Sequence, residues 1–140
     1  MKSSVVDSSF FVRSIIPHPD QISHVEKIAE WKTDEVSLYA PMLWHYEVAS
    51  SITKSLHFKQ ITAEQATASL LFTEEFDIVL VPPNREIFIA AYEWTLKLRR
   101  ASAYDSFYLA LAQAIGTDFW TADKKLYNAV GTDWIHMLES

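Results

Sequence analysis

Four acidic residues are each predicted to lie where a strand gives way to a helix: Asp7, Glu47, Asp105 and Asp123. Asp7 ends a short β-branched strand, and Asp123 follows a short aromatic strand. Glu47 lies near the start of the helix after the second predicted strand, and Asp105 opens a strongly apolar helix that ends at Gly116. Because sites in parallel sheets form beyond the carboxyl ends of the strands, we expect the four carboxylates to lie together.

A gathering of carboxylates favours one kind of chemistry. Like charges repel, so a fold that brings four acids together needs protons or cations to hold them. Mg²⁺ and Mn²⁺ prefer oxygen ligands. A pair of such ions about 4 Å apart can lower the pKa of an attacking water and neutralise the leaving oxygen of a phosphodiester. The acids therefore predict metal-dependent hydrolysis of a phosphodiester bond.

Each acid alone also has an ordinary structural explanation. Asp7 could be a turn residue, and Glu47 could be an edge residue of an apolar helix. Asp105 and Asp123 could simply cap their helices. The chemical interpretation depends on the four acids lying together.

The elements that would position these acids alternate along the chain. The predicted strands cover residues 4–7, 35–39, 77–81, 119–121 and 134–138, with Ser8 and Ser9 as turn or cap residues. The predicted helices cover residues 10–16, 20–31, 41–58, 63–76, 84–100, 105–116 and 123–130. Short apolar strands between helices indicate an α/β fold with a mostly parallel sheet of about five strands, covered by helices on both faces.

Composition limits the class of protein. A length of 140 residues suits a single domain covering residues 1–140. The absence of cysteine excludes disulfides and thiolate metal sites, and none of the five histidines has zinc-site spacing. No stretch approaches the about 20 apolar residues of a membrane span, and no signal-peptide pattern is present, so a cytoplasmic location is expected.

Charge argues against nonspecific nucleic-acid coating but permits a local basic rim. The formal net charge is −6. Basic residues nevertheless flank the predicted acid cluster, and they could contact phosphates. The candidates are Arg13, Arg99, Arg100 and Lys124.

Four segments together resemble the successive motifs of PIN-domain ribonucleases, and most closely the VapC-like toxins of toxin–antitoxin pairs. The segments are Val5-Val-Asp-Ser-Ser9, Pro41-x5-Glu47-Val48, Tyr104-Asp-Ser-Phe-Tyr-Leu-Ala-Leu-Ala112 and Thr121-Ala-Asp-Lys-Lys-Leu126. Each motif alone is weak, but the ordered set covers nearly the whole chain. One departure is Ser50, where similar sequences often carry Asn.

The resemblance implies a PIN-like three-layer α/β/α sandwich and a Mg²⁺- or Mn²⁺-dependent endoribonuclease. By position, it assigns metal binding and catalysis to Asp7, Glu47, Asp105 and Asp123, with Ser8 and Thr121 as supporting residues. It also implies a homodimer, a cognate antitoxin and an RNA substrate such as tRNA or rRNA. Aromatic residues including Trp44, Phe58 and Phe72 are hypothesised to line a dimer or antitoxin groove.

Other functions remain open from the sequence. A PIN-like domain could serve only as an RNA- or protein-binding module, or as an RNA-processing nuclease outside a toxin–antitoxin system. A phosphatase with Asp7 as nucleophile would need a second Asp at position 9, where this chain has Ser9. A receiver domain would need adjacent acids and a late lysine, which cannot be placed.

Overall fold

The computed structural model describes residues 2–100 and 102–138. Five strands form one sheet in the order β3-β2-β1-β4-β5, and every neighbouring pair is parallel. The strands are β1 (Ser3–Val6), β2 (Ser37–Pro41), β3 (Val79–Val81), β4 (Asp118–Trp120) and β5 (Ile135–His136). The predicted parallel five-stranded sheet is confirmed.

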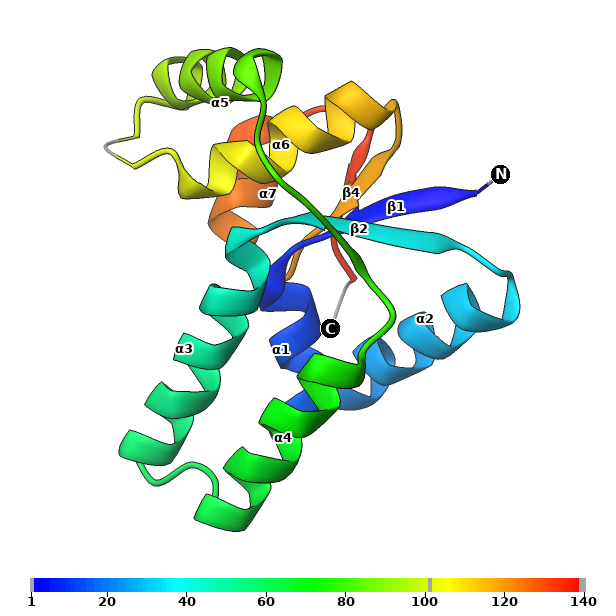
Figure 1. Cartoon of the computed structure of the whole chain (residues 1–140), viewed down its shortest axis with the longest axis vertical. Helices are drawn as coiled ribbons and strands as arrows, with labels where there is room; N and C mark the ends of the chain where they lie inside the picture. Colours follow the sequence, from blue (N-terminus) through cyan, green and yellow to red (C-terminus); the bar gives the residue numbers. More distant parts are fainter. Residues whose placement is uncertain (1, 101, 139–140) are drawn as a thin grey trace.

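Seven helices cover the sheet in the described part of the chain. They are α1 (Ser8–Ile15), α2 (Gln21–Thr33), α3 (Leu43–His57), α4 (Ala63–Glu75), α5 (Arg85–Leu98), α6 (Tyr104–Ile115) and α7 (Lys124–Val130) (Figure 1). Short polar side chains fix several of their ends. Helix α4 begins with a capping box, in which the Thr62 hydroxyl accepts from Gln65 N at 3.1 Å and the Gln65 side chain accepts from Thr62 N at 2.9 Å.

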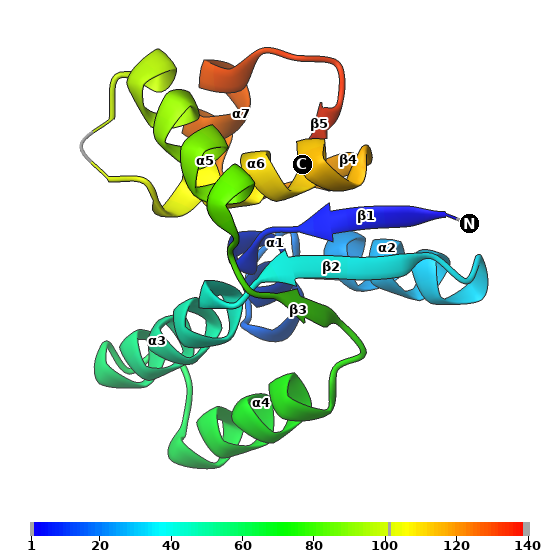
Figure 2. The same ribbon diagram turned by 45° about the horizontal axis from the view of Figure 1, so that its top comes forward.

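The strand order explains why helices lie on both faces. The chain first moves outward from β1 to β2 and β3, so right-handed crossovers place α1 to α4 on one face. It then returns past β1 to β4 and β5, which places α5 to α7 on the other face (Figure 2). The predicted three-layer sandwich is therefore confirmed. The reversal of direction falls between β1 and β4.

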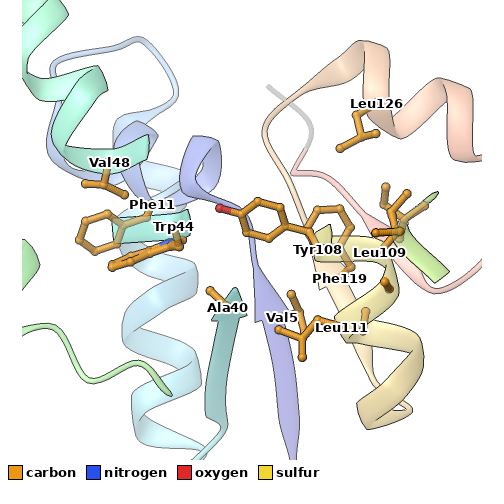
Figure 3. Close-up of a cluster of buried hydrophobic side chains, with 14 of the residues drawn as sticks. Val5, Phe11, Ala40, Trp44, Val48, Tyr108, Leu109, Leu111, Phe119 and Leu126 are labelled. Carbon is orange, nitrogen blue, oxygen red and sulfur yellow. The ribbon is translucent and has the colours of Figure 1, made fainter. Parts of the chain in front are cut away.

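The core is packed between the central strands and the helices on either side. Val5, Ala40 and Phe119 are fully buried on the three central strands. Figure 3 shows Tyr108 and Leu109 of α6 approaching them from one side, and Trp44 from the other. These contacts hold the ends of β1, β4 and α6 in fixed relative positions.

Three expectations need correction. Helix α1 begins at Ser8 rather than residue 10, because Asp7 caps it directly. Asp105 does not follow a strand: it lies in the first turn of α6, which is reached from α5. Trp44 lies in the core with 1% of its surface exposed, so it cannot line a binding groove, whereas Phe58 and Phe72 are 68% and 50% exposed.

Within the described residues, no helix combines the length and the apolar character needed to cross a membrane.

Candidate active site

Asp7 lies at the point where the sheet changes direction. Its backbone N–H donates to Trp120 O at 2.9 Å, which continues the pairing of β1 with β4 by one residue. The chain then leaves β1 into α1 on one face and β4 into α7 on the other. Asp7 is 4% exposed and forms the N-cap of α1, where its carboxylate accepts from Ser9 N. This is the position at which ligand sites form in open α/β sheets.

Two hydroxyl groups hold the Asp7 carboxylate from opposite sides of this junction. The fully buried Thr121 donates from Oγ1 to Asp7 Oδ2 at 2.7 Å, and Ser9 donates from Oγ to the same oxygen at 2.9 Å. Ser9 Oγ also accepts from Ala122 N at 3.1 Å. Thr121, which was expected to support the site, contacts Asp7 directly. Ser9, which the sequence suggested only as a turn or cap residue, belongs to the same network.

Glu47 projects from α3 toward Asp7. Ser8 Oγ lies 3.2 Å from Glu47 Oε1 and 3.3 Å from Asp7 Oδ1, so this hydroxyl joins the two acids. A second donor comes from the opposite face of the sheet: Tyr108 Oη donates to Glu47 Oε1 at 2.6 Å. Tyr108 is not among the site residues predicted from the sequence. Its hydroxyl, three residues after Asp105 in a mostly apolar helix, was the one sequence signal for a role beyond packing.

Asp105 pairs with a neighbouring cation rather than capping its helix. No side-chain hydrogen bond caps α6, and Arg100 Nη1 donates to Asp105 Oδ2 at 3.2 Å. Arg100, predicted as an RNA contact, is thus engaged with one of the acids.

Asp123 caps α7, as its ordinary structural explanation predicted. Its Oδ1 accepts from Leu126 N at 3.1 Å as the N-cap of α7. Its own N–H donates to Thr121 Oγ1 at 3.0 Å, so Asp123 is tied to the hydroxyl that holds Asp7.

The acids influence one another electrostatically. Burial is the largest cause that raises the pKa of Asp7, Glu47 and Asp105 above their ordinary values. Neighbouring charges add to this effect. The charge of Asp105 raises the pKa of Asp7 and that of Glu47, Asp7 raises the pKa of Glu47, and Asp123 raises the pKa of Asp105. Four acids from four segments therefore share one electrostatic environment.

Hydrogen bonds and one cation oppose these shifts without cancelling them. The bonds from Thr121 and Ser9 lower the pKa of Asp7, the Tyr108 bond lowers that of Glu47, and Arg100 lowers that of Asp105. Because each pKa remains raised overall, burial and mutual repulsion outweigh these compensating contacts.

The donor types suit a hard divalent cation, but the arrangement is not preformed. Carboxylate oxygens are the ligands that Mg²⁺ and Mn²⁺ prefer, and a cation would relieve the repulsion among these acids. Across residues 2–100 and 102–138, however, no three Asp, Glu or His side chains are arranged to hold a metal ion. Asp105 is paired with Arg100 and Asp123 with a helix terminus, so these two side chains would have to reorient.

The predicted basic residues divide into two groups. Arg13 and Lys124 line one cleft of about 530 Å³, together with Asp20, His24, Ala122, Tyr127, Asn128, Met137 and Leu138. Ala122 connects this cleft to the acids through its bond to Ser9. Arg99 and Arg100 instead lie beyond α5, where Arg99 adopts a left-handed conformation with φ of 54°.

Comparison with solved structures shows the same fold in several proteins, one of which is a toxin. The sarcin–ricin loop cleaving toxin VapC20 of Mycobacterium tuberculosis is 15% identical, with a TM-score of 0.65 over 91% of this chain and 95% of that one. The VapBC2 complex of Rickettsia felis, bound to a promoter DNA fragment, contains a chain that is 14% identical, with a TM-score of 0.71 over 98% of this chain and 99% of that one.

A third similar structure is the FitAcB complex of Neisseria gonorrhoeae, at 12% identity and a TM-score of 0.67 over 97% of this chain and 96% of that one. Comparison with curated protein sequences gives no match. The model of the PIN domain family matches residues 4–131, which include all four acids. The chain belongs to the PIN domain family.

Proposed function

We propose that this chain is a Mg²⁺- or Mn²⁺-dependent endoribonuclease and the toxin of a toxin–antitoxin pair. The observation that carries the proposal is the electrostatic coupling of Asp7, Glu47, Asp105 and Asp123 at the carboxyl edge of the sheet. A domain kept only for binding would have no need to hold Asp7, Glu47 and Asp105 where burial and repulsion disfavour their charged forms. Membership of the PIN family and the fold shared with VapC20 support the same activity.

The four acids have different roles in this proposal. Asp7 and Glu47 are the fixed ligands, because hydroxyl groups already orient both carboxylates. Asp105 and Asp123 complete the site after leaving Arg100 and the end of α7. A bound divalent ion would supply Lewis acidity for activating water and stabilising the leaving oxygen. Thr121 and Ser8 act by holding the carboxylates in position.

The substrate would lie across the acids and into the cleft beside them. Arg13 and Lys124 enter this cleft from α1 and α7, and its wall includes the aromatic ring of Tyr127. Cationic side chains contact phosphates without reading sequence, whereas an aromatic ring can stack on a base. Arg100, once released from Asp105, would contact a phosphate on the opposite side.

An antitoxin segment would occupy an apolar groove on the helical face formed by α1, α2 and α4. This groove measures about 330 Å³, and Ile15, Val25, Ile28 and Phe72 contribute to its walls. Such a groove suits the apolar face of a peptide helix. Of the aromatic residues expected in a partner groove, Phe72 lies here.

The homodimer would form through α5. Phe88, Ile89, Tyr92 and Leu96 are each more than half exposed on this helix. Contiguous exposed apolar side chains are typical of protein–protein interfaces.

A cleavage assay on structured RNA tests the enzymatic proposal. Purified wild type should cut tRNA or rRNA in Mg²⁺ or Mn²⁺ and should not cut in EDTA. Asp7→Asn should abolish cutting, because Asn preserves the N-cap but removes the ligand charge. Thr73→Val is the matched control, since Thr73 is buried and its hydroxyl bonds only within α4. Metal-independent cutting, or full activity in Asp7→Asn, would refute the proposal.

A further inference from the structure

Tyr108 is a fully buried residue of α6 whose hydroxyl reaches Glu47 of α3, on the other face of the sheet. Its ring is fully buried and stacks against Phe119, with 5.8 Å between ring centroids and 26° between planes. Figure 3 shows the ring reaching from α6 past β1, with its hydroxyl oxygen pointing away from Phe119 and toward Trp44. The rest of the buried face of α6 is aliphatic or small: Ser106, Leu109, Ala110, Leu111 and Ala112. A phenylalanine would fill the same space without a polar atom.

The Tyr108 hydroxyl donates a hydrogen bond to a carboxylate, that of Glu47. Burying a hydroxyl without a hydrogen bond is costly, and Tyr108 Oη satisfies this need by donating to Glu47 Oε1 at 2.6 Å. Burial raises the pKa of Tyr108 well above its ordinary value, and the charges of Asp7 and Glu47 add to this effect. The phenol therefore keeps its proton and remains a donor at neutral pH.

The bond also fixes which way the Glu47 carboxylate faces. Both Tyr108 and Ser8 contact the same oxygen, Oε1. None of the residues that the structure describes donates a hydrogen bond to Glu47 Oε2. One oxygen is thus anchored to the core, and the other is left for a ligand.

We propose that Tyr108 is a positioning residue that holds the Glu47 carboxylate in the orientation needed to bind a divalent metal ion. The inference rests on the proposed function, since it takes Glu47 as a metal ligand. It assigns Tyr108 no contact with RNA or with the reacting atoms. Tyr108 acts from the opposite face of the sheet, so it links the packing of α6 to the ligand geometry of α3.

The size of the effect follows from the role of groups that orient metal ligands. Removing such a partner lowers metal affinity by about 10- to 100-fold. Tyr108→Phe removes only the hydroxyl and keeps the stack on Phe119, so we expect Mn²⁺ to bind about 10-fold more weakly. Thr73→Val also removes one buried hydroxyl, but it lies in α4 away from the acids and should leave Mn²⁺ affinity unchanged.

A double-mutant cycle on Mn²⁺ binding separates positioning from general loosening of the core. The Kd for Mn²⁺ would be measured by electron paramagnetic resonance for wild type, Tyr108→Phe, Glu47→Gln and the double variant, with thermal unfolding in EDTA to verify folding. If Tyr108 acts through Glu47, Tyr108→Phe weakens binding in the wild-type background and has no further effect in the Glu47→Gln background. An equal loss in both backgrounds, or no loss in either, would overturn the inference.

These results are distinguishable from failure of the enzymatic proposal. Wild type that binds Mn²⁺ with the predicted coupling but cuts no RNA would refute the nuclease activity and leave the role of Tyr108 standing. Wild type that binds no Mn²⁺ would overturn the role of Tyr108 together with the metal site.

Discussion

The bond between Thr121 and Asp7 ties the carboxyl ends of β1 and β4 together at the site, and Thr121→Val tests its importance. Valine matches the shape of threonine but cannot donate to Asp7 Oδ2 or accept from Asp123 N, which the native hydroxyl does at 2.7 and 3.0 Å. Thr121 is fully buried, so water cannot readily replace either bond.

The expected loss can be summed from these two bonds. A hydrogen bond to a charged group contributes about 1.5–3 kcal/mol, and a neutral one contributes about 1 kcal/mol. Thr121→Val should therefore lower the free energy of unfolding by about 2.5–4 kcal/mol. At roughly 3 °C per kcal/mol for a domain of this length, Tm should fall by about 8–12 °C.

The pH dependence of this loss identifies its cause. The Thr121 bond lowers the pKa of Asp7, so it stabilises the charged carboxylate most. Loss of the bond raises the folded-state pKa of Asp7 further, so the contribution of the bond is fully present above the pKa of Asp7 in the variant and decreases as pH falls from there to the wild-type pKa. The difference in Tm between wild type and Thr121→Val should thus be larger at pH 8 than at pH 4.5.

Differential scanning calorimetry in EDTA measures both effects. Thr121→Ser keeps the hydroxyl and should recover most of the stability, whereas Thr73→Val should cost about 1 kcal/mol at either pH. A Thr121→Val protein that melts within 2 °C of wild type at pH 8 would contradict the reasoning, as would a difference in Tm that does not change with pH.

Three other predictions concern charge, the Arg100 pair and assembly. In EDTA, Tm should be higher at pH 5 than at pH 8, because the folded-state pKa values of Asp7, Glu47 and Asp105 are raised above their unfolded-state values. The stability that these groups contribute is fully present below the unfolded-state pKa values and is lost as pH rises through the folded-state pKa values. Mn²⁺ should restore this stability at pH 8. A Tm in EDTA that is as high at pH 8 as at pH 5 argues against the charged cluster. Arg100→Gln should move the acidic limb of the cleavage profile to higher pH, because Arg100 lowers the pKa of Asp105; an unmoved limb would show that this pair does not affect catalysis. Tyr92→Glu should convert a dimer to a monomer in light scattering, and a monomeric wild type at micromolar concentration would exclude the dimer.

The sequence was informative about the fold because its signals were local. Short apolar strands alternate with capped helices, and such patterns depend on periodicity and turn chemistry rather than on distant contacts. The helices predicted from residues 63 and 84 begin at local capping signals, which are Thr62 with Gln65 for the first and Asn84 for the second. The error at Asp105 has a related origin, because two helices in succession lie between β3 and β4, and an acid that opens the second helix resembles one that follows a strand.

The contacts that orient the acids could not be predicted in this way. Thr121 meets Asp7 only after β4 pairs with β1, which brings together residues that are 114 positions apart. Tyr108 reaches Glu47 across the sheet, and sequence periodicity places it in the core without identifying a partner. The prediction for Trp44 was wrong because its aromatic character suggested an interface. In the structure its ring packs against that of Phe11, with 4.9 Å between ring centroids, and is buried in the core.

The central claim is that four acids from separate segments form one metal centre. Anomalous diffraction from crystals soaked in Mn²⁺ tests it most directly. We predict a peak coordinated by Asp7 and Glu47, with Asp105 turned away from Arg100 toward the ion. Absence of a peak at these carboxylates, or a Mn²⁺ ion bound only elsewhere on the molecule, would show that the acids do not form a metal centre.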